Sequence, residues 1–176
     1  MNKKGLMILY NNFEDCEALV TRAVLMKNLL KIITVTNNPD LKVFSAQKLQ
    51  VKSDIRVNQI NLEKDKYDFL IIPGGPYVQE LLLEENNDKL KKILEIINYF
   101  YKKNKIIGAI CAAPALLGKI GLLKFRKFTC YPNYDKYIEG IYCPEEKAVT
   151  SENLITSRSP DTVFQFCEHL LAKIIS

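Results

Sequence analysis

The sequence predicts a doubly wound α/β fold, in which a mostly parallel sheet carries helices on both faces. Short apolar runs alternate with longer amphipathic stretches along the whole chain, and strands that alternate with helices form right-handed crossover units around a parallel sheet. The chain also contains no linker, internal repeat or low-complexity segment. We therefore expect a single domain over residues 1–176, a length that suits one domain.

Buried strands are predicted where short apolar runs are bounded by turn residues. Residues 43–55 form a weaker pattern that suits a hairpin or an edge strand, and residues 127–157 suit several short strands and turns. The predicted buried strands are Gly5–Tyr10, Ile32–Thr36, Tyr67–Ile72 and Lys105–Ile110.

Helices are predicted where apolar residues recur at helical spacing. The last helix has the clearest start, because Ser159 suits the capping position and Pro160 the first helical position. The other predicted helices are Cys16–Leu30, Asn87–Lys103 and Ala112–Ile120. In the first of them, the apolar stripe expected to face the core consists of Leu19, Ala23, Leu25, Met26 and Leu29.

Composition and charge exclude several classes of protein. Hydrophobic residues make up 48% and charged residues 26% of the chain, which argues against a disordered chain or a coiled-coil rod. No apolar run approaches the length of a membrane span or a signal-peptide core, so we expect a cytoplasmic protein without membrane contact. The net charge of +5 comes from scattered lysines and few arginines, which disfavours nucleic-acid binding.

The five cysteines favour reduced thiols over a disulfide framework. Their number is odd, and no two of them are two to four residues apart. His169, the only histidine, falls on a predicted helix. We therefore expect neither a zinc site nor any other metal site.

Cys111 is the first candidate for chemistry, because ligands bind beyond the carboxyl ends of parallel strands. In the segment 108–114, a buried strand ends in a turn of small residues and a helix follows at once. Such a turn would be strained and would expose the thiol at a helix N-terminus, where its pKa is lowered. The alternative is a small buried cysteine that only packs in a strand-to-helix joint.

Two further strand ends carry candidate residues. Gly74 and Gly75 stop a strand, and glycine lets backbone N–H groups approach a ligand, although the pair also suits a plain turn. Glu17 falls in the first turn of a helix, where a carboxylate ordinarily complements the helix dipole in solvent. Beside a thiolate it makes chemical sense only if burial raises its pKa, so that it keeps its proton and donates a hydrogen bond to sulfur.

Together these segments resemble the ThiJ/PfpI superfamily, specifically its DJ-one deglycase branch. The similarity extends over nearly the whole chain, and residues 107–114 carry its most specific part. The other matching segments are residues 4–10, 14–18, 70–75, 156–160 and 162–166. The resemblance implies a flavodoxin-like three-layer sandwich that dimerises through its first helix. It also implies Cys111 as an oxidisable nucleophile, Glu17 as its protonated partner, and the Gly75 and Ala112 amides as oxyanion donors.

The sequence departs from that family's pattern at two positions. Tyr131 takes the place of a common active-site histidine, and Ala112 stands where peptidase branches place a histidine after the nucleophile. A tyrosine is a poor proton shuttle at neutral pH but a good hydrogen-bond donor, so Tyr131 is the third candidate catalytic residue. Its alternative role is a ring that packs on the edge of the sheet.

Three functions are compatible with these residues. The leading hypothesis is a cofactor-independent glyoxalase or deglycase, in which a Cys111 thiolate attacks a small reactive carbonyl and Glu17 moves protons; without a histidine, turnover should be slow. The second is a non-catalytic redox sensor or stress-protective protein whose Cys111 is oxidised. The third is a peptidase or amidase, which the missing histidine disfavours.

Overall fold

The computed structural model describes residues 3–84 and 87–176, and its centre is a seven-stranded sheet in the order β10-β11-β7-β6-β1-β2-β5. Neighbouring strands run parallel except β10 and β11, which are antiparallel. The fold is therefore the predicted α/β sandwich with a mostly parallel sheet. The strands are β1 (Lys4–Ile8), β2 (Lys31–Thr36), β5 (Ile55–Arg56), β6 (Phe69–Ile72), β7 (Ile106–Ile110), β10 (Ala148–Ser151) and β11 (Leu154–Ser157).

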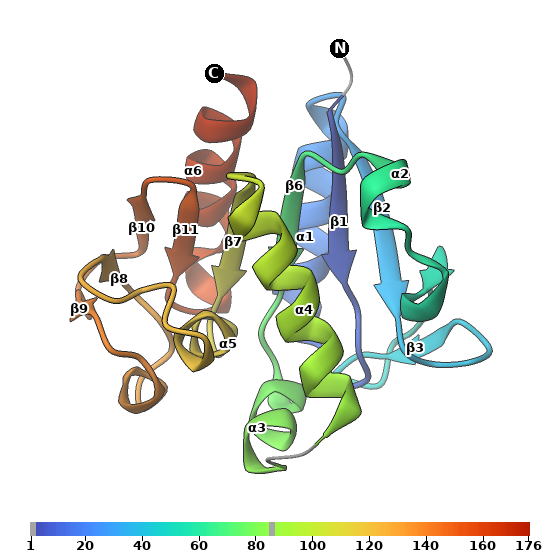
Figure 1. Ribbon diagram of the computed structural model, residues 1–176, viewed down its shortest axis with the longest axis horizontal. Coiled ribbons are helices and arrows are strands. Elements are labelled where there is room, and N and C mark those ends of the chain that lie inside the picture. The colour runs from blue at the N-terminus through green and yellow to red at the C-terminus, as the bar shows by residue number, and fades with distance from the viewer. Residues whose placement is uncertain (1–2, 85–86) are drawn as a thin grey trace.

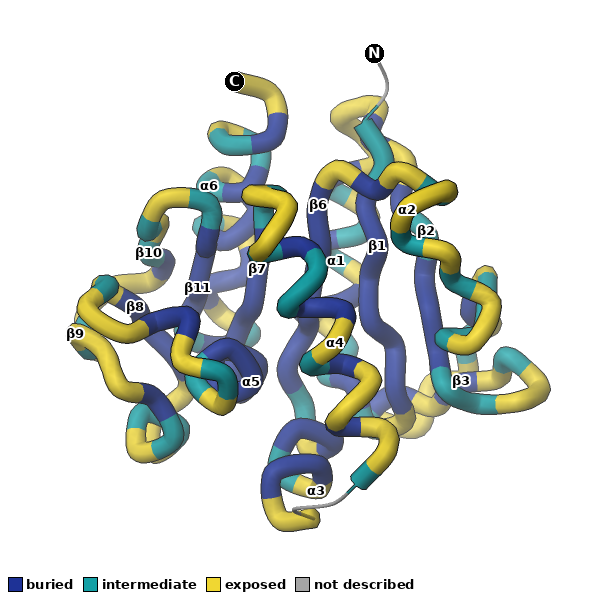
Figure 2. The backbone as a smooth tube through the Cα atoms, in the orientation of Figure 1, coloured by how far each residue is buried: buried dark blue, intermediate teal, exposed yellow. Residues whose placement is uncertain are grey.

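Helices cover both faces of this sheet (Figure 1). α1 (Asp15–Lys27) and α6 (Val163–Ile175) pack against each other on one face, and α4 (Asp88–Lys102) lies against β6 and β7 on the other. The central strands are consequently buried on both sides (Figure 2). This burial explains why β6 and β7 are almost continuously apolar, as is typical of strands in a parallel sheet.

Shorter elements complete the chain. The predicted hairpin or edge strand is both: β3 (Lys42–Phe44) and β4 (Gln50–Lys52) form a hairpin, and β5 is the edge of the main sheet. As predicted, residues 127–157 hold short strands, including the parallel pair β8 (Lys127–Phe128) and β9 (Ile141–Tyr142). The 3-10 turns are η1 (Val57–Gln59), η2 (Asp135–Tyr137) and η3 (Pro160–Thr162), and the short helices are α2 (Leu62–Asp65), α3 (Pro76–Leu83) and α5 (Pro114–Lys119).

The predicted helix boundaries need two corrections near the sheet's carboxyl edge. The turn after β6 continues directly into α3, which the sequence did not reveal; Gly75 occupies the capping position and Pro76 the first helical position. α5 begins at Pro114, two residues later than predicted, because residues 111–113 form a turn first. Ser159 and Pro160 do start the final helical segment, although its first turn is the 3-10 turn η3.

The predicted inward face of α1 is wrong. Of the five residues in the expected stripe only Leu25 is buried, whereas Leu19, Ala23, Met26 and Leu29 are exposed. The face that meets the core instead carries Glu17, Ala18, Thr21 and Leu25. Because two of these residues are polar, hydrophobic periodicity placed the stripe on the wrong side of the helix.

Within the described residues, no helix has the length and apolar character needed to cross a membrane.

Leu25 and Met26 give a matched test of this orientation, because both lie on α1. Leu25 is 0% exposed and Met26 is 42% exposed. Leu25→Ala should lower the free energy of unfolding by about 2–5 kcal/mol, because it leaves a cavity between α1 and the sheet. Met26→Ala should change it by less than about 0.5 kcal/mol, because the side chain is exposed. Urea unfolding of both variants checks the difference, and equal losses would contradict the assigned face.

Candidate active site

The backbone of Cys111 is strained and held on both sides. Its φ angle is +65°. This is the left-handed region, which glycine adopts freely but which L-residues other than asparagine and aspartate rarely occupy. The Cys111 N–H donates to the Ser157 carbonyl at 2.9 Å, and the Cys111 carbonyl accepts from the Tyr131 N–H at 2.8 Å. The sequence predicted a tight, strained turn here, and these two bonds show how neighbouring segments fix it.

Glu17 reaches the same edge from the first turn of α1. Its side chain is fully buried, and its Oε2 accepts a hydrogen bond from the Gly74 N–H at 2.7 Å. In return, the Glu14 N–H donates to the Gly74 carbonyl at 2.9 Å. The start of α1 and the end of β6 are therefore joined by two hydrogen bonds that fix the direction of the Glu17 carboxyl group.

Glycine is required at both positions after β6. A Cβ at Gly74 would lie 2.7 Å from Cys111 Cβ and 2.7 Å from Glu17 Oε2, so these two side chains close around one small space. A Cβ at Gly75 would lie 2.3 Å from the Asn12 carbonyl oxygen, and its φ of +124° is strained for any other residue. The Gly-Gly pair is thus more than a plain turn, since the acid and the thiol meet only where no side chain intervenes.

Burial controls the protonation of Glu17. Desolvation raises the pKa of its carboxyl group from 4.5 to about 8, and the nearby charge of Glu14 adds to the rise, while hydrogen bonds to Cys111 and Gly74 oppose it. The carboxyl group is therefore mainly protonated at neutral pH, as expected for a partner of Cys111. Its second oxygen, Oε1, has no well-aligned hydrogen-bond partner among the described residues.

The pKa of the Cys111 thiol shifts in the opposite direction from the one predicted. Burial raises it most, followed by the charge of Glu17 and the hydrogen bond to Glu17, while a hydrogen bond with the Ala112 amide lowers it. The prediction of a lowered thiol pKa relied on a helix beginning directly after Cys111. Because α5 starts only at Pro114, that helix end does not outweigh desolvation.

Cys111 nevertheless faces a pocket. Its residue surface is 8% exposed, and it lines a cavity of about 440 Å³ at the carboxyl ends of the strands. Gly75 and Ala112, the two predicted oxyanion donors, line the same cavity. The structure therefore brings Cys111, Glu17, Gly75 and Ala112 together, since Glu17 is bonded to Gly74, the residue that precedes the cavity residue Gly75.

Tyr131 lines the cavity as well, and its ring meets the ring of Tyr134 edge to face, with centroids 6.4 Å apart. Sequence reasoning missed Tyr134, together with Gln79 and Pro160, which also contribute to the wall. Tyr134 follows Tyr131 in a turn whose geometry local patterns do not specify. Gln79 lies on α3, which was not predicted, so no signal pointed to it.

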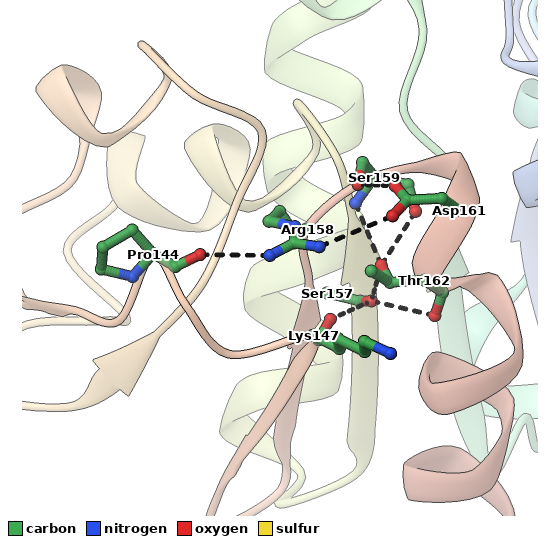
Figure 3. A network of polar contacts seen from close by, with 7 residues as sticks. All are labelled: Pro144, Lys147, Ser157, Arg158, Ser159, Asp161 and Thr162. Atoms are coloured by element: carbon green, nitrogen blue, oxygen red, sulfur yellow. Dashed lines mark hydrogen bonds and ion pairs between the residues drawn. The ribbon is translucent and has the colours of Figure 1, made fainter.

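Arg158 belongs to a polar network around the segment 157–162 (Figure 3). Its guanidinium group lies 3.5 Å from the Asp161 carboxylate and donates to the Pro144 carbonyl at 3.4 Å. In the same network, Ser157 Oγ contacts Thr162 Oγ1 at 2.7 Å. These contacts fix the segment 157–162, which supplies both the acceptor for the Cys111 N–H and the cavity residue Pro160.

The other cysteines and the histidine lie apart from this cavity. Cys130 and Cys167 are buried, Cys143 is partly exposed, and Cys16 is exposed on α1. His169 lies on α6, where its Nδ1 contacts Thr150 Oγ1 at 2.8 Å. Among the described residues, no cluster of three or more histidine, cysteine, aspartate or glutamate side chains could hold a metal ion.

Comparison with known proteins identifies the family. The model of the DJ-1/PfpI family matches residues 3–173. The chain belongs to the DJ-1/PfpI family. A Methanocaldococcus jannaschii protein, MJ0967, is 33% identical over 91% of this chain and 77% of its own length. The Caenorhabditis elegans glutathione-independent glyoxalase DJR-1.2 is 30% identical over 93% of this chain and 84% of its own length.

Solved structures agree with this membership in the DJ-1/PfpI family. The crystal structure of Drosophila melanogaster DJ-1beta superposes with a TM-score of 0.86 at 26% sequence identity, covering 98% of this chain and 90% of that chain. The similarity therefore includes the sheet, both helical layers and the segments around Cys111. The family includes a glyoxalase, DJR-1.2.

The raised pKa of Glu17 has a consequence for stability. An unfolded chain loses the Glu17 proton near pH 4.5, whereas the folded protein keeps it until about pH 8. The contribution of Glu17 to the free energy of unfolding should therefore fall as the pH rises between these values. Glu17→Gln, which mimics the protonated acid, should abolish this loss, which amounts to a few kcal/mol at about 1.4 kcal/mol per pKa unit. Urea unfolding at pH 5 and pH 8 tests it; parallel pH profiles would contradict a raised pKa.

Proposed function

We propose that this protein is a cofactor-independent glyoxalase-type enzyme that converts small 2-oxoaldehydes into 2-hydroxy acids. One observation carries the proposal: the fully buried carboxyl group of Glu17 accepts a hydrogen bond from Gly74 through Oε2, and this oxygen and the Cβ of the cavity-lining Cys111 close around the same small space. A nucleophile and a proton carrier are the two groups that this isomerisation requires. The glyoxalase DJR-1.2 among the relatives supports the same reaction class.

The first step joins Cys111 to the substrate. The Cys111 sulfur forms a bond to the aldehyde carbon as Glu17, in its ionised form, accepts the thiol proton. The carbonyl electron pair moves to oxygen, and the Gly75 and Ala112 amides stabilise the resulting oxyanion. Glu17 then returns its proton to this oxygen, which gives a hemithioacetal.

The second step moves hydrogen between adjacent carbons. Ionised Glu17 removes the proton from the former aldehyde carbon, and the electrons form an enediolate whose negative charge lies on the former ketone oxygen. Glu17 then delivers the same proton to the former ketone carbon, and the hydroxyl proton of the hemithioacetal passes to the former ketone oxygen. The ketone is thereby reduced to an alcohol, and the former aldehyde carbon is oxidised to a thioester. Water hydrolyses the thioester and restores the Cys111 thiol. The net change is the addition of one water molecule, so no redox cofactor or metal enters the balance.

Tyr131 completes the site in this proposal as a hydrogen-bond donor at the cavity wall. Because no histidine shares the cavity, proton transfer relies on Glu17 alone, and we expect slow turnover.

We also propose a cytoplasmic homodimer. Leu19, Ala23 and Met26 expose an apolar strip on α1 that such a dimer would cover.

Lactate formation from methylglyoxal tests the mechanism. Cys111→Ser should reduce kcat/KM at least 100-fold, because the nucleophile is lost, and Glu17→Gln should reduce it about 100-fold or more, because the proton carrier is lost. Cys143→Ser serves as a matched control, since Cys143 lies apart from the cavity, and should retain activity. Equal activity in all variants would refute the proposed roles.

The pH dependence of kcat/KM gives a second test. The Glu17–Cys111 pair must lose one proton before Glu17 can accept the thiol proton, and Glu17 has a pKa of about 8. For wild type, kcat/KM should therefore rise with pH and level off above about pH 8. An activity that is already maximal at pH 6 would contradict this order of proton transfers.

A second candidate function is a redox sensor whose Cys111 is oxidised. It is favoured by the absence of a histidine from the cavity lining, since oxidation needs no proton shuttle. Treatment with dilute peroxide followed by peptide mass spectrometry separates the two functions. Selective gain of two oxygen atoms at Cys111, as a sulfinic acid, without dicarbonyl turnover would favour the sensor over the enzyme.

A further inference from the structure

We propose that the cavity selects 2-oxoaldehydes whose second substituent is an aromatic ring, and that Tyr131 and Tyr134 determine this specificity. This inference rests on the proposed function, because it names the substrate class of the same site. It concerns the rings of Tyr131 and Tyr134, whose apolar surface in the cavity wall has no role in the proposed catalytic steps.

Tyr131 is fixed relative to the nucleophile. Its N–H donates to the Cys111 carbonyl at 2.8 Å, so its backbone moves with the catalytic turn. The side chain is 45% exposed even though it lines the cavity. Edge-to-face or offset contacts between aromatic rings are stabilising beyond the apolar area that they bury. Among the described residues, Tyr131 makes one such contact, with Tyr134. A large part of its surface therefore remains free for a ligand.

Tyr134 lies on the same side of the cavity and close to the reacting sulfur. Its ring plane is inclined by 70° to that of Tyr131. Burial raises the pKa of its hydroxyl group, and the proximity of Cys111 adds to the rise. The two rings form an angled aromatic corner, in which a third ring can contact one face and one edge.

The rest of the wall contains both apolar and polar residues. Pro76 and Pro160 are apolar rings, which suit an aromatic substituent, whereas Gly75 and Ala112, the proposed oxyanion donors, suit the dicarbonyl end. The side chains of Glu14 and Gln79 complete the polar part of the wall. A substrate with a carbonyl head and an aromatic tail matches both parts at once. Methylglyoxal matches only the polar part.

The size of the cavity leads to the same class. Its volume of about 440 Å³ lies in the range typical of sites for ligands of many atoms. A methyl group would leave the tyrosine corner exposed to water. A phenyl group would bury more apolar surface there and would gain binding free energy in proportion.

The reaction itself is unchanged with an aromatic substrate. Phenylglyoxal and one water molecule give mandelate, just as methylglyoxal and one water molecule give lactate. The sulfur–carbon bond forms and breaks at the same aldehyde carbon, and Glu17 carries the same proton. Because the ring also changes the intrinsic reactivity of the ketone, the change in the substrate ratio between wild type and the tyrosine variants isolates what the two rings contribute to binding.

The ratio of kcat/KM for phenylglyoxal to kcat/KM for methylglyoxal measures this specificity. Wild type should favour phenylglyoxal at least tenfold. In Tyr131→Ala and Tyr134→Ala the ratio should fall at least fivefold, mainly through the KM for phenylglyoxal, and the corresponding Phe variants should restore most of it. Tyr101→Ala, on α4 and outside the cavity, is the matched control and should leave the ratio unchanged.

Binding to an inactive variant separates this inference from the proposed function. In Cys111→Ser, titration calorimetry should show mandelate binding at least fivefold more tightly than lactate, and Tyr131→Ala in the same background should remove the difference. Mandelate selectivity without turnover in wild type would refute the proposed enzyme but support the aromatic site. Turnover with a ratio near 1, or equal binding of both acids, would overturn the inference and leave the enzyme intact.

Discussion

The hydrogen bond from the Gly74 N–H to Glu17 Oε2 connects the architecture of this protein with its chemistry. The bond, 2.7 Å long, spans 57 residues of sequence and joins the end of β6 to the first turn of α1. It satisfies one oxygen of a carboxyl group that burial keeps protonated near neutral pH. The same oxygen and the Cβ of Cys111 close around one small space, so the carboxyl group lies beside the residue where the proposed reaction needs a proton carrier. Without this bond, a fully buried acid would have no reason to point toward the thiol.

The parallel sheet makes this arrangement possible. Its central strands end at one edge, so loops that are far apart in sequence come together there (Figure 1). Each connection contributes to the site. The loop after β1 and the first turn of α1 supply Glu14 and Glu17, the loop after β6 supplies two glycines, and the turn after β7 holds Cys111 at a positive φ. The segment after β11 then accepts the Cys111 N–H. The strain at Cys111 persists because these neighbours hold it from several sides.

Much of this site could be predicted from sequence because its residues lie at strand ends. Small residues around Cys111 and the Gly-Gly pair are local patterns, and alternating strands and helices place both at one edge. The inward face of α1 could not be predicted, since the polar residues Glu17 and Thr21 occupy it and hydrophobic periodicity reports only apolar faces. The direction of the Cys111 pKa shift was also beyond reach. It depends on burial and on where α5 begins, and neither is encoded in the local motif.

The protonation state of Glu17 is the central claim, and infrared difference spectroscopy measures it most directly. Spectra of wild type minus Glu17→Gln, recorded from pH 6 to pH 9, isolate the carbonyl stretch of a protonated carboxylic acid at this position. We expect that band to be present at pH 6 and to disappear with a midpoint near the pKa of about 8. A carboxylate signal already complete at pH 6 would contradict the account, because Glu17 would then be an ordinary ionised acid beside the thiol.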